Sequence, residues 1–155
     1  MARFSVPQAK NMVTRCLRNI IDPVPTPKER KEVWEHFQNR CAYCGEPMDP
    51  AARIGHLDHV VPASQGGSNH VSNFVLSCPA CNGDDKRELD WDKFLRSVAG
   101  DAYGERRAKI HAWLHHDPSA RTMLTETELA VLERVTAEAK EAITKAADEL
   151  RSLRG

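Results

Sequence analysis

The sequence predicts an α+β fold in which a small module of short strands lies between helical segments. Apolar residues recur at helical intervals near both ends of the chain, short β-type runs occupy the middle, and two Cys-x-x-Cys pairs bracket those runs. A length of 155 residues with 41% hydrophobic and 28% charged residues suits one modest core with helical additions. We therefore expect three parts, at residues 1–25, 26–100 and 101–155.

The first part is predicted to be an amphipathic helix followed by an extended connector. Ser5 and Gln8 have the spacing of a capping box, and apolar residues then follow at helical intervals over residues 7–21. Cys16 lies on this apolar stripe, so we interpret it as a core thiol. The proline-rich segment 22–27 cannot be helical and is expected to be extended and stiff.

A second predicted helix leads directly into the first cysteine pair. Thr26 is the expected N-cap, Pro27 occupies the first helical position, and Glu29 completes the capping box. The apolar face of this helix is formed by Val33, Trp34 and Phe37. This helix opens the central part of the chain.

Between the cysteine pairs the pattern changes from helical to β-type. Short apolar runs at residues 57–61 and 74–76 flank a polar, glycine-rich loop at residues 64–69. A short helix is expected to begin near Cys81 or Asn82. The predicted order is therefore strand, loop, strand, helix.

Beyond residue 90 the chain is predicted to be helical again, with one long final helix. Thr125 and Glu128 form a capping box at the start of residues 126–153. The apolar positions of this helix alternate by three and four: Leu129, Leu132, Thr136, Ala139, Ile143, Ala146, Leu150 and Leu153. Such a seam either packs on its own domain or pairs with a second copy, so a homodimer through the C-terminal helix is an open alternative.

The two cysteine pairs predict a structural zinc site. Cys41 and Cys44 are separated by 33 residues from Cys78 and Cys81, and two such knuckles supply the four thiolates of a tetrahedral zinc ion. A redox role is disfavoured because redox motifs do not come as two matched pairs around a β-type segment. A four-thiolate site is closed, so this Zn²⁺ is expected to brace a small core and to do no chemistry.

The residues between and after these pairs resemble the HNH nuclease family. The resemblance rests on an ordered set over residues 41–89: Cys41, Cys44, Asp58, His59, Val60, Val61, Pro62, Gly66, Gly67, Asn73, Cys78, Cys81 and Asn82. His59 and Asn73 are 14 positions apart, and Asn73 and Asn82 are 9 apart. These spacings fit the three positions that give the family its name.

The resemblance implies a ββα-metal motif and a metal-dependent DNA endonuclease that hydrolyses phosphodiester bonds, by nicking or by double-strand cutting. His59 would be the general base, a task that suits an imidazole at neutral pH. Asp58 and Asn82 would hold the catalytic ion, and their oxygen donors favour Mg²⁺ or Mn²⁺ over zinc. Asn73 would hydrogen-bond within the loop and hold His59 in orientation.

The DNA-binding surface is less well predicted than the cutting site. The formal net charge is +0, whereas DNA-binding proteins usually carry a basic excess. The family often has a lysine where Asp85 stands, so Lys86 and Arg87 are the residues expected to reach DNA. We interpret His56 as a strand neighbour of the site and His70 as a loop residue.

Two classes of function follow from these observations. The first is the endonuclease, and the second is a zinc-knuckle module that binds nucleic acid without cutting, or that serves a larger phage or restriction machine. No apolar run approaches the ~20 residues of a membrane span. The cysteine content and the absence of a signal-peptide pattern predict a cytoplasmic protein. The family resemblance implies a bacterial or phage-encoded one.

Overall fold

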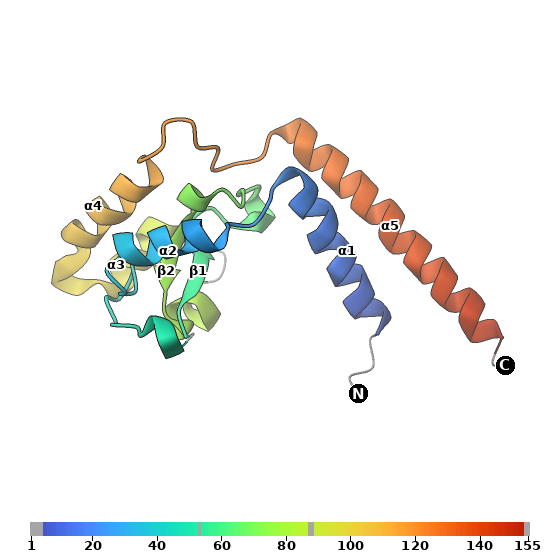
Figure 1. Ribbon diagram of the computed structural model, residues 1–155, viewed down its shortest axis with the longest axis horizontal. Coiled ribbons are helices and arrows are strands. Elements are labelled where there is room, and N and C mark those ends of the chain that lie inside the picture. The colour runs from blue at the N-terminus through green and yellow to red at the C-terminus, as the bar shows by residue number, and fades with distance from the viewer. Residues whose placement is uncertain (1–4, 53, 87–88, 154–155) are drawn as a thin grey trace. The chain divides into compact units, whose positions relative to one another are not determined.

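The computed structural model describes residues 5–52, 54–86 and 89–153 (Figure 1). The chain divides into two compact units, one spanning Val24–Leu124 and the other formed by Met1–Pro23 with Thr125–Gly155. This grouping differs from the expected boundaries, because residues 101–124 belong with the central unit and the two ends of the chain belong together. We name these the central unit and the terminal unit.

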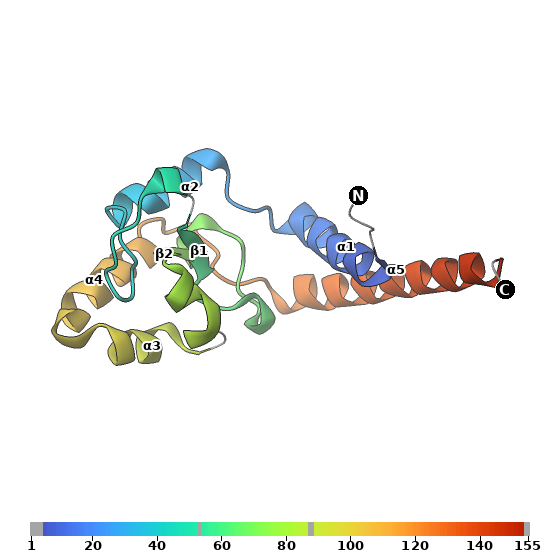
Figure 2. The same cartoon turned by 90° about the horizontal axis from the view of Figure 1, so that it is seen from below.

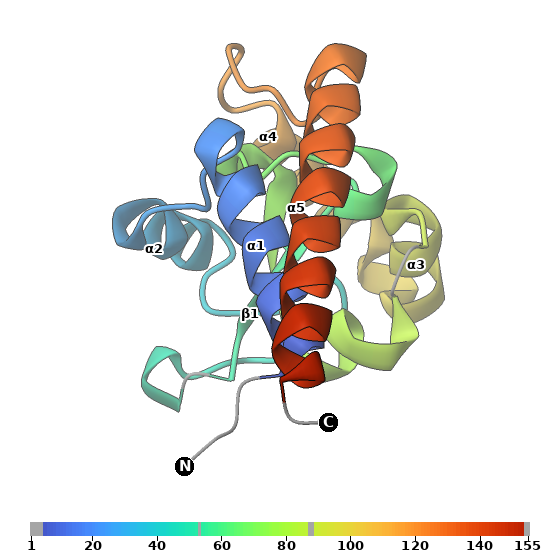
Figure 3. The same cartoon turned by 90° about the vertical axis from the view of Figure 1, so that its right-hand side faces the viewer.

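The terminal unit is a pair of helices, α1 (Val6–Ile21) and α5 (Glu126–Ser152), which run side by side (Figure 3). Both predicted capping boxes are formed, at Ser5 and at Thr125. The α5 seam is partly covered as far as Ile143, whereas Leu150 and Leu153 near its end are 65% and 77% exposed. Helix α1 of the same chain therefore packs against α5, the helix through which a homodimer was considered.

The interpretation of Cys16 as a core thiol is wrong, because the side chain is exposed. None of the 16 residues of α1, all of which lie in the described part of the chain, is fully buried. A single partner helix covers only a narrow stripe of its neighbour, so the wider apolar stripe of α1 extends past the contact. Met12 and Ile20 on the same helix are 56% and 76% exposed.

The central unit is built on a two-stranded antiparallel sheet of β1 (His56–His59) and β2 (Phe74–Ser77). Asp58 is opposite Val75 and His59 is opposite Phe74. The strands lie between α2 (Pro27–His36) on one side and α3 (Trp91–Val98) on the other, with α4 (Tyr103–Leu114) beside α3 (Figure 2). The described short turns are Pro50–Ala52, Ala63–Gln65, Val71–Asn73, Cys81–Asp85 and Gly100–Ala102.

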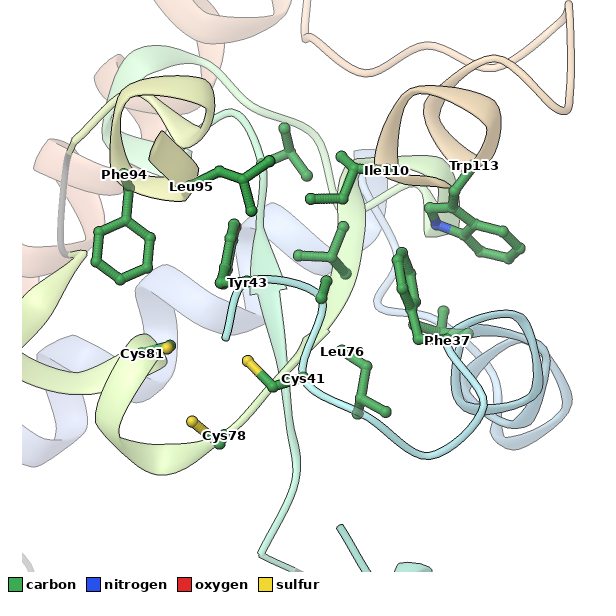
Figure 4. Packing of buried hydrophobic residues seen from close by; sticks show 14 of the residues in the cluster. Phe37, Cys41, Tyr43, Leu76, Cys78, Cys81, Phe94, Leu95, Ile110 and Trp113 are labelled. Carbon is green, nitrogen blue, oxygen red and sulfur yellow. The ribbon is translucent and has the colours of Figure 1, made fainter. Parts of the chain in front are cut away.

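The core of the central unit surrounds β2, all four residues of which are buried. Figure 4 shows Phe37, Leu95 and Ile110 around this strand, with Tyr43 between the strands and Phe94. The Trp113 Nε1 donates a hydrogen bond of 2.7 Å to the Phe74 carbonyl, which ties α4 to the sheet. The predicted α+β class is confirmed.

The predicted start of α2 is formed as expected. Thr26 caps α2 and accepts from the Glu29 amide, while the Glu29 carboxylate accepts from the Thr26 amide at 2.7 Å. The Asp90 carboxylate accepts from two amides at the start of α3. Among the described residues, none of the helices has the length and apolar character that crossing a membrane requires.

Candidate functional site

The four cysteines of the two knuckles converge on one point in the central unit. Their sulfur atoms all lie within 4.8 Å of one another, and Figure 4 shows the Cys41, Cys78 and Cys81 side chains turned toward a common centre. Thiolates about 2.3 Å from a tetrahedral zinc ion are about 3.8 Å apart. Cys44 Sγ and Cys78 Sγ are 3.7 Å apart. The donor set and its spacing therefore fit a zinc ion, and the cluster could hold one.

The first knuckle is a tight turn that follows α2. The Gly45 amide donates to the Cys41 carbonyl at 2.9 Å, and Gly45 has a φ of +80°, a conformation that glycine adopts without strain. The Arg106 guanidinium packs against Gly45 and donates to the Tyr43 carbonyl at 2.8 Å. A side chain at position 45 would therefore displace the arginine that links α4 to this turn.

Burial opposes ionisation of two of these thiols, Cys44 and Cys81, in the absence of a cation. Burial raises the pKa of Cys44 to about 11 and also raises the pKa of Cys81. Burial opposes ionisation of Cys41 as well, but backbone hydrogen bonds outweigh it and lower the pKa of that thiol. A bound cation would supply the charge that holds all four as thiolates.

Asp58 lies on β1 at the centre of a small charged network. Its Oδ2 accepts a hydrogen bond from the Tyr43 hydroxyl at 2.7 Å and is 3.0 Å from the Lys86 ammonium. The ammonium also donates to the His59 carbonyl at 2.9 Å. Burial and the adjacent Asp58 charge raise the pKa of Tyr43 well above its ordinary value, so the phenol is a neutral donor.

Lys86 is buried, and the structure does not place it on the surface where a DNA contact was expected. Its side chain is 1% exposed, against 13% for Asp58. A buried ammonium needs a carboxylate partner, and here that partner is the predicted metal ligand. Arg87, the other predicted DNA contact, lies outside the described residues.

His59 is half-buried at the end of β1 and is oriented by a residue that the sequence analysis did not single out. Its Nε2 is 3.0 Å from the Asn69 Oδ1, and its ring lies 4.1 Å from the ring of Phe74. Asn69 ends the glycine-rich loop, and it follows Gly66-Gly67-Ser68 directly. Its place in the glycine-rich loop between the two strands was the sequence feature that could have identified it as a site residue.

Asn73 is fully buried and fastens the glycine-rich loop. Its Nδ2 donates to the Val61 and Ser68 carbonyls at 3.0 and 2.8 Å, and its Oδ1 accepts from the Val61 amide at 2.9 Å. The expected hydrogen bonding within the loop is therefore present. A hydrogen-bond contact to the His59 imidazole comes from Asn69, whereas the Asn73 side chain contacts the backbone of the loop.

Asn82 lies in the short Cys81–Asp85 turn that follows the second knuckle. Its amide donates to the Cys78 carbonyl at 3.0 Å, and its side chain is half-buried. Gly83 interrupts the helical geometry of this turn with a ψ of −113°. Because Lys86 follows one turn later and reaches Asp58, the segment that carries Asn82 is tied to β1.

The two remaining histidines lie close to these residues in sequence. His56 begins β1 and is exposed. The His70 Nδ1 accepts from the Ser72 amide at 3.3 Å, which caps the turn before β2. His70 is therefore a loop residue with a structural role.

Comparison with known proteins gives one family match. Residues 41–88 match the family model described as HNH endonuclease. A crystal structure of Streptococcus thermophilus Cas9 in complex with AGGA PAM is similar at a TM-score of 0.43 and 14% identity, over 96% of this chain. This chain spans 18% of the length of that Cas9 chain. No curated protein matches the chain. The match of residues 41–88 to the HNH endonuclease family model supports a nuclease-type function for this part of the chain.

Proposed function

We propose that the protein is a Mg²⁺- or Mn²⁺-dependent endonuclease that hydrolyses phosphodiester bonds in DNA. The observation that carries the proposal is the Asp58–His59 pair at the end of β1. Side chains from the first knuckle before β1 and from segments after β1 hold this pair in place. Tyr43 and Lys86 hold the carboxylate, and Asn69 holds the imidazole. Side chains held in this way lose little conformational freedom when a substrate binds.

His59 would act as the general base. Its Nε2 faces Oδ1 of the Asn69 side chain. This contact favours the neutral tautomer that has the proton on Nε2 and the basic lone pair on Nδ1. A water at Nδ1 would lose its proton as its oxygen attacks phosphorus. The same imidazole then holds that proton on Nδ1.

Asp58 and Asn82 would hold the divalent ion. Both offer oxygen donors, the type that Mg²⁺ and Mn²⁺ prefer. The bound ion would neutralise charge on the phosphate and stabilise the leaving 3′ oxygen. In the structure the Lys86 ammonium carries the positive charge beside Asp58. The site is thus already organised around a cation.

The four cysteines would hold a structural zinc ion that braces the domain. All four positions of a tetrahedral site are then occupied by thiolates, so the zinc has no open position for a water or a phosphate. Because these cysteines are free thiols that could together hold one metal ion, we further propose that the protein works in a reducing compartment.

One observation favours the alternative of a nucleic-acid-binding module that does not cut. The Asp58 Oδ2 already has two partners, Tyr43 and Lys86, and a divalent ion must compete with the ammonium for this carboxylate. If the Lys86 ammonium stays bound to the Asp58 carboxylate at every physiological concentration of the divalent ion, the domain binds DNA without hydrolysing it.

Plasmid cleavage separates the two functions. The zinc-loaded protein is incubated with supercoiled DNA and Mg²⁺ or Mn²⁺, and nicked or linear product is expected. His59→Ala should abolish product, whereas His111→Ala, at an exposed position on α4, should cleave like the wild type. Equal activity of the His59→Ala and wild-type proteins, or none with either metal, contradicts the proposed nuclease.

A further inference from the structure

A pocket of about 360 Å³ lies directly beside the proposed general base. One side is formed by the site itself, through His59, Asn69 and Phe74. The other side comes from α2 and the start of β1, through Arg30, Trp34 and His56. Small-molecule sites range from about 300 to 1,000 Å³, so this pocket has room for one nucleotide and is too small for a duplex.

The aromatic wall of the pocket depends on a close approach between α2 and the chain before β1. A Cβ built on Gly55 would lie 2.4 Å from Cη2 and Cζ2 of the Trp34 indole, so only glycine lets the ring come this near. Trp34 is half-buried and packs against the core. The ring is therefore held in place before any ligand arrives.

The cationic part of the pocket comes from the same helix. The Arg30 Nε donates to the Pro25 carbonyl at 3.1 Å, and both residues line the pocket. Neighbouring lysines on α2 are engaged differently, since Lys28 and Lys31 pair with Glu32 and Glu35 one turn later. Guanidinium groups bind phosphate through paired N–H donors.

We propose that this pocket binds one unpaired nucleotide next to the phosphate that is cut. The base lies against Trp34 and His56, and its phosphate is bound by Arg30. This inference rests on the proposed nuclease function, because His59 at one wall fixes where the scissile phosphate must lie. Aromatic rings with a nearby cation are the usual means of holding an unpaired base without reading its sequence.

Binding of two short oligomers tests the proposal. The full-length zinc-loaded protein is titrated, in buffer without Mg²⁺ or Mn²⁺, with an octamer of thymidylate and with an abasic octamer that has the same phosphates. Stacking of a base contributes roughly 1–3 kcal/mol, so the thymidylate octamer should bind about 5- to 150-fold more tightly in competition fluorescence anisotropy. A ratio near one in the wild type overturns the proposal.

Variants assign the preference to the pocket. Trp34→Leu should bring the ratio close to one, and Arg30→Gln should weaken both octamers by a similar factor. Trp91→Leu on α3 and Lys31→Gln on α2 are the matched controls and should keep the wild-type ratio. If Trp34→Leu does not fold, His56→Ala at the exposed start of β1 should also reduce the ratio. A ratio that survives in every folded pocket variant overturns the proposal.

The nuclease proposal is tested separately on the same proteins. If the wild type cuts plasmid DNA with Mn²⁺ but binds both octamers equally, the nuclease proposal is supported and the nucleotide-pocket proposal is overturned. If the wild type binds the thymidylate octamer more tightly in a Trp34-dependent way but never cuts DNA, the pocket proposal is supported and the nuclease proposal is overturned.

Discussion

Replacement of Lys86 by methionine should destabilise the central unit strongly. The ammonium is 1% exposed, is 3.0 Å from the Asp58 carboxylate and donates to the His59 carbonyl at 2.9 Å. Methionine keeps most of the side-chain volume but leaves both acceptors without this donor. Removing one partner of a buried ion pair costs about 3–5 kcal/mol, because the remaining charge is buried and unpaired.

The same variant should respond to metal in a characteristic way. A divalent ion that binds Asp58 restores positive charge at this place and no longer competes with the ammonium. At 100 times the dissociation constant a ligand stabilises the folded state by about 2.7 kcal/mol. Addition of Mn²⁺ should therefore narrow the difference in unfolding free energy between Lys86→Met and the wild type.

Urea unfolding of the zinc-loaded proteins, with and without Mn²⁺, measures both effects. Lys93→Met removes an exposed lysine on α3 and should change the unfolding free energy by less than about 0.5 kcal/mol. The double variant Asp58→Asn/Lys86→Met should lose less than the sum of the two single variants, because the two groups are in contact. A Lys86→Met protein within about 0.5 kcal/mol of the wild type refutes the reasoning.

Three further predictions concern the neighbours of the site. Tyr43→Phe removes the hydroxyl bound to Asp58 and should weaken Mn²⁺ binding about 10- to 100-fold in calorimetry, with unchanged zinc content; wild-type affinity contradicts this role. Asn69→Ala should lower kcat about 10- to 100-fold, because the His59 ring loses the contact that orients it. Asn69→Asp should stabilise the His59 imidazolium and so move the acidic limb of the pH–rate profile to higher pH. An unchanged kcat in the first variant together with an unchanged profile in the second contradicts the positioning role of Asn69. Burial lowers the pKa of His36 below its ordinary 6.5, so the unfolded chain takes up this proton first and stability falls as pH drops below 6.5; the fall should be shallower in His36→Gln, and an equal pH dependence refutes it.

Features that depend on neighbours in sequence were predicted well. The capping boxes at Ser5, Thr26 and Thr125 are formed, because a cap is decided within four residues. The four-cysteine cluster is also present: the spacing within each knuckle is local, and the presence of a second matched knuckle indicated that the two pairs meet although 33 residues separate them. The strands were found, although β1 ends at His59 and the predicted run continued to residue 61.

Features that depend on distant parts of the chain were not predicted. Lys86 was assigned to the surface because sequence reasoning placed it by its distance from Asn82, whereas the fold turns it inward to Asp58. Tyr43 and Asp58 are 15 positions apart, and no periodicity links them. Likewise, the stripe of α5 indicates that it needs a partner without saying which one, and the structure supplies α1.

The position of Tyr43 inside the first knuckle has a consequence for the order in which this protein matures. The residue lies between Cys41 and Cys44, so the thiols that would close around zinc also fix the phenol that reaches Asp58. A newly made chain without zinc would lack that fixed phenol, and the metal site proposed at Asp58 would form poorly. Zinc would then be loaded first and the hydrolytic ion second. A cell poor in zinc would hold an inert form of the protein, even where magnesium is abundant.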